Sequence, residues 1–110
     1  MNKIISITSE NSQTDWKKVI DGTDDTYITL FQNTKIDIEL DLTTRSIVFD
    51  FQKGFHPKII SVNDVETPLD RNTACLEVPV IFKQADKIAV QFKESYDPYK
   101  RIFIYNIFAK

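Results

Sequence analysis

The sequence predicts an all-β protein, an antiparallel β-sandwich of about eight short strands of jelly-roll or related topology, with at most one short helix. Apolar and polar side chains alternate with a period of two in several short runs, which places them on opposite faces of strands. These runs recur every 8–12 residues or so, a spacing typical of sandwiches. A small closed barrel of the oligonucleotide-binding kind is the second choice, because its curved strands usually need glycines and only two are present.

The clearest alternation runs from Lys35 to Phe51. Up to residue 42 it sets four aliphatic side chains on one face against three acidic ones: Ile36, Ile38, Leu40 and Leu42 against Asp37, Glu39 and Asp41. After a polar break at residues 43–45, Ser46 to Phe51 alternates again. Two such runs joined by three residues predict a β-hairpin with one apolar face.

The other strands are shorter and are separated by polar turns. We expect them at residues 4–7, Tyr27–Phe31, Lys58–Val62, Val65–Pro68, Ala74–Phe82, Lys87–Lys93 and Arg101–Phe108. Asn63 and Asp64 form a two-residue hairpin turn between the third and fourth of these. Pro79 cannot donate a backbone hydrogen bond, so its strand is expected at a sheet edge or to end there.

One short helix is predicted between Thr14 and Ile20. Thr14 would cap its N-terminus, and Trp16, Val19 and Ile20 recur at helical spacing on one face. An isolated tryptophan more often fills a core than contacts a ligand, so Trp16 is assigned to the interior.

Composition and charge limit the classes to which the protein can belong. A chain of 110 residues that is 42% hydrophobic and 27% charged predicts one globular domain, residues 1–110. The net charge of −2 argues against nucleic acid and anionic membranes as partners. No apolar run approaches the roughly 20 residues of a membrane span. The first residues lack the pattern of a signal peptide, so we expect a protein kept in a reducing cytoplasm or released from it inside a larger particle.

The sequence offers no catalytic constellation, so an enzyme is not expected. His56 is the only histidine, and we expect it in an exposed loop beside Pro57. Cys75 lies in an apolar run, where a thiol is usually a small buried hydrophobe. One histidine and one cysteine cannot supply the four ligands of a zinc site, so no metal or other cofactor is predicted.

Three aspartates and a glycine make residues 21–26 the most acidic turn. Asp21, Asp24 and Asp25 can accept hydrogen bonds from their own backbone, which makes an Asx-rich turn the simpler interpretation. Their carboxylates could also bind a ligand or calcium, although the spacing differs from the helical calcium loop. We therefore keep all three as candidate binding residues.

Aromatic side chains in turns and loops are the other candidate binding residues. Tyr27 follows the acidic turn, and Phe55 lies in the loop before Pro57. Tyr96, Tyr99 and Arg101 lie in or beside the polar segment 94–100, where Pro98 indicates a surface loop. Exposed aromatic rings offer flat apolar faces to sugars or partner proteins, and tyrosine and arginine are enriched at interfaces.

The N-terminal third carries the motif W-x-x-V-I-D-G-x-x-D-T-Y followed by I-D-I-E-L-D-L, at Asp21, Gly22, Asp25, Thr26, Tyr27 and residues 36–42. In these residues it resembles discoidin-like (coagulation factor C-type) domains. This resemblance implies a β-sandwich that carries a sugar or lipid site on its loops. It suggests a carbohydrate-binding adhesion module with a cell-surface glycan as its partner.

The second half resembles small β-sandwich modules of bacteriophage particles, in I-I-S-V-N-D-V-E-T-P-L, L-E-V-P-V and K-I-A-V-Q-F. This resemblance implies a non-catalytic structural component of a virion, such as a head decoration, head fibre, tail or baseplate part. We expect it to contact other structural proteins or copies of itself, as a homo-oligomer assembled in the host cytoplasm. The Pro79 strand and the terminal strand 101–108 are the candidate contacts.

Overall fold

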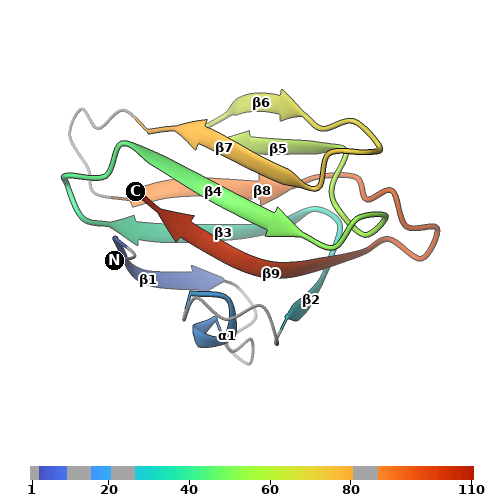
Figure 1. The fold of residues 1–110 in the computed structure, drawn as a ribbon, viewed down its shortest axis with the longest axis horizontal. Coiled ribbons are helices and arrows are strands. Elements are labelled where there is room, and N and C mark those ends of the chain that lie inside the picture. The colour runs from blue at the N-terminus through green and yellow to red at the C-terminus, as the bar shows by residue number, and fades with distance from the viewer. Residues whose placement is uncertain (1–2, 10–15, 21–26, 81–86) are drawn as a thin grey trace.

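The computed structural model describes residues 3–9, 16–20, 27–80 and 87–110, which form two antiparallel sheets packed face to face (Figure 1). The five-stranded sheet has the order β1 (Ile4–Ser9), β3 (Thr34–Leu40), β8 (Lys87–Phe92), β5 (Ile59–Val62) and β6 (Val65–Pro68). The four-stranded sheet has the order β2 (Ile28–Phe31), β9 (Arg101–Ala109), β4 (Ser46–Phe51) and β7 (Cys75–Pro79). One helical turn, α1 (Lys17–Ile20), accompanies them. The predicted antiparallel sandwich is confirmed.

The hairpin predicted between Lys35 and Phe51 is wrong. β3 pairs with β1 and β8, whereas β4 pairs with β7 and β9 in the other sheet. The connection turns at Asp41, whose carboxylate accepts the Thr43 backbone N–H at 2.8 Å, and Leu42 is 70% exposed. Alternation shows which face of a strand is buried but not which strand lies beside it. Both strands bury their apolar faces in one core from opposite sides.

The second predicted hairpin is confirmed. β5 and β6 pair from Ile59 opposite Pro68 to Val62 opposite Val65. Asn63 and Asp64 have φ angles of 49° and 67°, as a two-residue turn with the twist of a hairpin requires. Asn63 also fastens the turn to β8, because its side-chain oxygen accepts the Ala89 N–H at 2.9 Å.

The core lies between the two sheets and is closed on one side by α1. Phe92 of β8 meets Phe49 and Phe51 of β4 edge to face, with ring centroids 5.8 and 5.9 Å apart. Trp16 and Val19 are buried, as the helical spacing predicts, and α1 packs against β9. These contacts join strands that are far apart in sequence and hold the loops at the sandwich ends in place.

Two further expectations about the strands are resolved. β7 is an edge strand, as Pro79 indicates. Cys75 on it is exposed rather than buried, because Leu76 and Val78 point inward and the alternation turns Cys75 to the outer face of the sheet. β9 lies between β2 and β4, so the terminal strand offers no edge to a partner. None of the described helices is long and apolar enough to cross a membrane.

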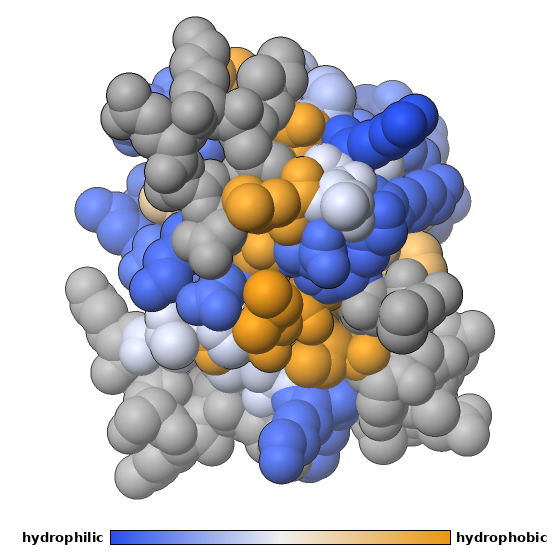
Figure 2. All heavy atoms as spheres, turned by 90° about the vertical axis from the view of Figure 1, so that its left-hand side faces the viewer, coloured by the Kyte–Doolittle hydropathy of each residue, from blue (hydrophilic) through white to orange (hydrophobic). Residues whose placement is uncertain are grey.

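The two ends of the sandwich differ in character. Both termini lie at the left-hand end in Figure 1, where the Lys3 N–H donates to the Ala109 carbonyl. Figure 2 looks onto that end and shows a band of apolar side chains between charged groups. The opposite end carries the β4–β5 and β8–β9 loops, in which Phe55 and Tyr99 lie.

Candidate functional site

A cluster of aromatic rings covers the outer face of the four-stranded sheet where β9 begins. Ile102 and Ile104 point into the core, so Phe103 between them points outward. The ring of Phe103 stacks on Phe55 with centroids 4.5 Å apart and planes at 4°. Tyr27 lies 5.1 Å from the Phe103 ring. We call Tyr27, Phe55, Tyr99, Arg101, Phe103 and Tyr105 the aromatic platform.

Tyr105 extends this platform along β9. Its ring lies 5.7 Å from that of Tyr27 at 68°, an edge-to-face arrangement. Its hydroxyl is 3.2 Å from the side-chain oxygen of Gln52, to which it donates a hydrogen bond. The rings thus contact one another and Gln52. These contacts restrict the rotamers of the rings before a ligand binds, which lowers the entropy cost of binding.

Arg101 gives the platform its charge. Its guanidinium carbon lies 5.3 Å from the centre of the Phe55 ring, 5.2 Å from Tyr99 and 5.6 Å from Phe103, so it sits among three rings. Its Nε donates to Asp97 Oδ2 at 2.8 Å. This bond lowers the pKa of Asp97 and raises the pKa of Arg101, so both groups stay ionised over the ordinary pH range. Asp97 thereby fixes the plane of the guanidinium.

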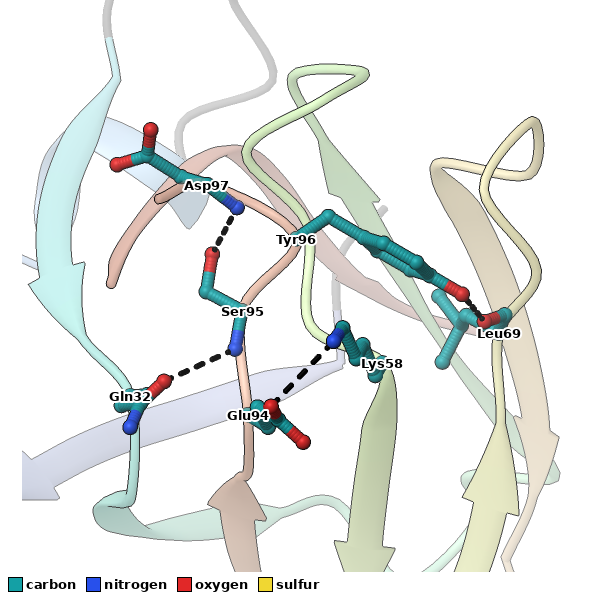
Figure 3. A network of polar contacts seen from close by, with 7 residues as sticks. All are labelled: Gln32, Lys58, Leu69, Glu94, Ser95, Tyr96 and Asp97. Carbon is teal, nitrogen blue, oxygen red and sulfur yellow. Dashed lines mark hydrogen bonds and ion pairs between the residues drawn. The ribbon is translucent and has the colours of Figure 1, made fainter. Parts of the chain in front are cut away.

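The β8–β9 loop is held by hydrogen bonds to its neighbours (Figure 3). The Ser95 N–H donates to the side-chain oxygen of Gln32 at 3.3 Å, and the Asp97 N–H donates to Ser95 Oγ at 3.1 Å. Lys58, just before β5, pairs at 3.3 Å with Glu94, which follows the neighbouring strand β8. This frame keeps Tyr99 on the surface, where it is 75% exposed.

Tyr96 points away from the platform, although it lies only three residues before Tyr99. Its hydroxyl donates to the Leu69 carbonyl at 2.6 Å, and Figure 3 shows the ring reaching across to that loop. The ring packs against His56 with centroids 4.7 Å apart. Tyr96 therefore ties the β8–β9 loop to the loop after β6.

The expectation that His56 is exposed is wrong, since the side chain is fully buried. Its Nδ1 accepts the Gly54 N–H at 3.2 Å, and its Nε2 lies 2.8 Å from the Asp70 carbonyl, to which it donates. His56 is buried because the β4–β5 loop folds under Tyr96 and the loop after β6. This contact joins segments far apart in sequence, so no local sequence pattern predicts it. His56 thus holds these loops together.

The structure brings four of the eight candidate binding residues together. Tyr27, Phe55, Tyr99 and Arg101 belong to the platform, whereas Tyr96 does not. Asp21, Asp24 and Asp25 fall outside the described residues, so a ligand role for them stays a prediction. Sequence analysis missed Phe103 and Tyr105, although the alternation of 101–108 set them opposite the buried Ile102 and Ile104. In the described part of the chain, no three His, Cys, Asp or Glu side chains gather as metal ligands.

The comparisons with known proteins rest on structure. The sequence matches no protein-family model and no curated protein. The fold is similar to that of a CBM32 domain of a GH31 protein bound to GalNAc, with a TM-score of 0.69 and 16% identity over 99% of this chain and 97% of that one. It is also similar to the CBM32 of AlyQ in complex with 4,5-unsaturated mannuronic acid, with a TM-score of 0.68 and 15% identity over 100% and 98% of the two chains.

Two further structures extend the likeness. The family 32 module of C. perfringens NanJ, in complex with galactose, gives a TM-score of 0.60 and 17% identity over 99% of this chain and 98% of that one. A truncated AlyQ with CBM32 and alginate lyase domains gives a TM-score of 0.69 and 13% identity, and this chain covers 32% of it. The protein therefore has the discoidin-like sandwich fold found in family 32 carbohydrate-binding modules.

Proposed function

We propose that the protein is a non-catalytic carbohydrate-binding module and that the aromatic platform contacts the sugar. The observation that carries the proposal is the gathering of exposed rings around an ion-paired arginine at one end of the sandwich. Tyr99 and Tyr27 are 75% and 47% exposed, far more than structural aromatic residues need to be. The complexes of similar folds with GalNAc and galactose support a sugar as the ligand class.

The chemistry of the platform suits a sugar ring. The C–H face of a pyranose is apolar and packs against a flat aromatic ring, while its hydroxyls need hydrogen-bond partners. Tyr99 and Phe55 supply rings, and Arg101 lies between them with N–H donors beyond the one that Asp97 accepts. A ligand that stacks on Tyr99 therefore meets a donor at the same position.

A glycan array followed by titration calorimetry tests this function. Tyr99→Ala removes the most exposed ring of the platform, and we expect it to weaken binding of any array ligand about tenfold, or about 1.4 kcal/mol. Val65→Ala is the matched control, because Val65 is 68% exposed and lies on β6 of the other sheet. A loss of the same size in both variants, or an array with no bound glycan, would contradict the proposal.

A second candidate function is assembly through protein contacts, as in a virion component built from copies of this chain or other structural proteins. The apolar band across the end that holds both termini supports it (Figure 2). Leu42 in the nearby β3–β4 connection is 70% exposed. Analytical ultracentrifugation tests it: association that Leu42→Ser weakens is expected, and a strict monomer at micromolar concentration would exclude self-assembly.

A further inference from the structure

A hollow lies on the outer face of the five-stranded sheet, away from the aromatic platform. Its volume is about 480 Å³, within the size range of small-molecule sites. The strand register explains its shape. One outward row runs Thr8, Asp37, Ala89 across β1, β3 and β8, and the small Ala89 makes the floor.

The next outward row forms the rest of the hollow. It runs Lys35, Gln91, Ser61 across β3, β8 and β5. Asp64, in the β5–β6 turn, also lines it. We call this hollow, lined by the two rows and Asp64, the sheet groove.

The lining chemistry indicates the ligand. The groove presents hydroxyls from Thr8 and Ser61, carboxylates from Asp37 and Asp64 and an ammonium from Lys35. The Gln91 amide is oriented, because its nitrogen donates to the Asn33 carbonyl at 3.3 Å and leaves its oxygen as an acceptor. Mixed donors and acceptors at short spacing suit adjacent sugar hydroxyls, each of which can both donate and accept.

The same set of groups excludes other ligand classes. Among the described lining residues, two carboxylates stand against one ammonium, and this net negative charge disfavours anionic ligands such as uronates. None of the described residues that line it is aromatic, so a ligand would be held by hydrogen bonds rather than by ring stacking.

We propose that the sheet groove is a second binding site, which takes a neutral oligosaccharide segment through hydrogen bonds to Asp37, Ser61 and Gln91. It lies on the other sheet from the aromatic platform, so it does not rest on the function proposed for the platform. A module with both sites would contact two saccharide segments at once. On a polysaccharide surface, binding at one site would then raise the effective sugar concentration at the other, so two weak sites would give a higher overall affinity.

NMR titration of ¹⁵N-labelled protein with mannotriose, cellotriose and galactotriose tests the groove, with trigalacturonate as the anionic comparison. With the trisaccharide at about 10 mM, the titration detects binding with a Kd near 1 mM. At least one neutral trisaccharide should shift the amide signals of Ser61, Ala89 and Gln91, in Tyr99→Ala as well as in the wild type. Ala89→Leu fills the floor and should weaken this binding about tenfold or more.

The matched control is Lys87→Leu, which places a leucine on the same face of β8 outside the groove and should leave binding unchanged. If Ala89→Leu does not fold, Asp37→Asn replaces it with the same expectation. No groove shift with any neutral trisaccharide, a preference for trigalacturonate, or equal losses in the variant and control would overturn the proposal. Shifts confined to Tyr27, Phe55 and Tyr99 would overturn the groove yet support the platform, and no shifts anywhere would count against both.

Discussion

The two halves of the β8–β9 loop use the same residue type for opposite purposes. Tyr96 in the first half turns toward the protein, packs on the buried His56 and donates its hydroxyl to the Leu69 carbonyl. Tyr99 in the second half turns to solvent beside Arg101 and is 75% exposed. The inner tyrosine holds the loop in place, and the outer tyrosine is what the loop presents.

An aromatic residue in a polar loop is therefore not by itself a binding residue. The two tyrosines differ in what their hydroxyl and ring face contact. In Tyr96 both the hydroxyl and the ring face contact other parts of the protein. In Tyr99 one ring face lies against the Arg101 guanidinium and the rest of the ring is accessible. Stability and ligand affinity should therefore respond separately to changes in the two halves.

The largest effect is expected from His56→Ala. It removes a fully buried ring and both of its hydrogen bonds, to the Gly54 N–H and the Asp70 carbonyl. We expect a loss of about 3 kcal/mol in the free energy of unfolding, measured by urea denaturation. An unchanged urea midpoint would show that the packing of His56 against Tyr96, in the first half of the β8–β9 loop, contributes nothing to stability.

Arg101→Gln should act on the contact with Tyr99, in the second half of the loop, and reduce affinity for a glycan that binds the platform about tenfold. It removes a charged donor that sits among the rings of Phe55, Tyr99 and Phe103. Calorimetry with a ligand from the array measures it. Because Arg101 also pairs with Asp97, the urea midpoint of this variant is measured alongside, and binding lost only in proportion to unfolding would argue against a ligand contact.

The sharpest comparison is the same change made at both tyrosines. Tyr96→Phe leaves the Leu69 carbonyl without its 2.6 Å hydrogen bond and should cost about 1 kcal/mol of stability, with affinity unaltered. Tyr99→Phe should leave stability as it is. Urea denaturation of both variants measures the contrast, and equal midpoints would break the distinction between the two halves.

The smallest expected effect is on acidification. The Arg101 guanidinium holds the pKa of Asp97 below its ordinary value, and a hydrogen bond from the Thr73 hydroxyl does the same for Asp70. A carboxyl whose folded-state pKa is lowered stabilises the fold above its unfolded pKa and loses this contribution as the pH falls through the folded pKa. Stability should thus decline below about pH 4, and less steeply in Asp97→Asn, as measured by urea midpoints across that range.

The sequence predicts the sandwich well because burial has a local signature. Alternation in 36–40 and 47–51 marks the inner faces of β3 and β4, and the residues Asn63 and Asp64 mark a hairpin. Sheet membership has no such signature, which is why β3 and β4 were expected to pair. The site follows the same division: exposed rings near turns could be picked out, but the burial of His56 and the inward turn of Tyr96 depend on contacts between distant loops.

The strand order also has a consequence for how the chain reaches this state. Among the described strands, β5 and β6 are the one pair of sequence neighbours that lie side by side in a sheet. Every other ladder joins strands far apart in sequence, so the chain loses conformational entropy in closing a large loop before the ladder contacts form. Folding to the native state should therefore take milliseconds to seconds. During that delay the open ladder edges are exposed to other chains, and refolding yield should fall as protein concentration rises.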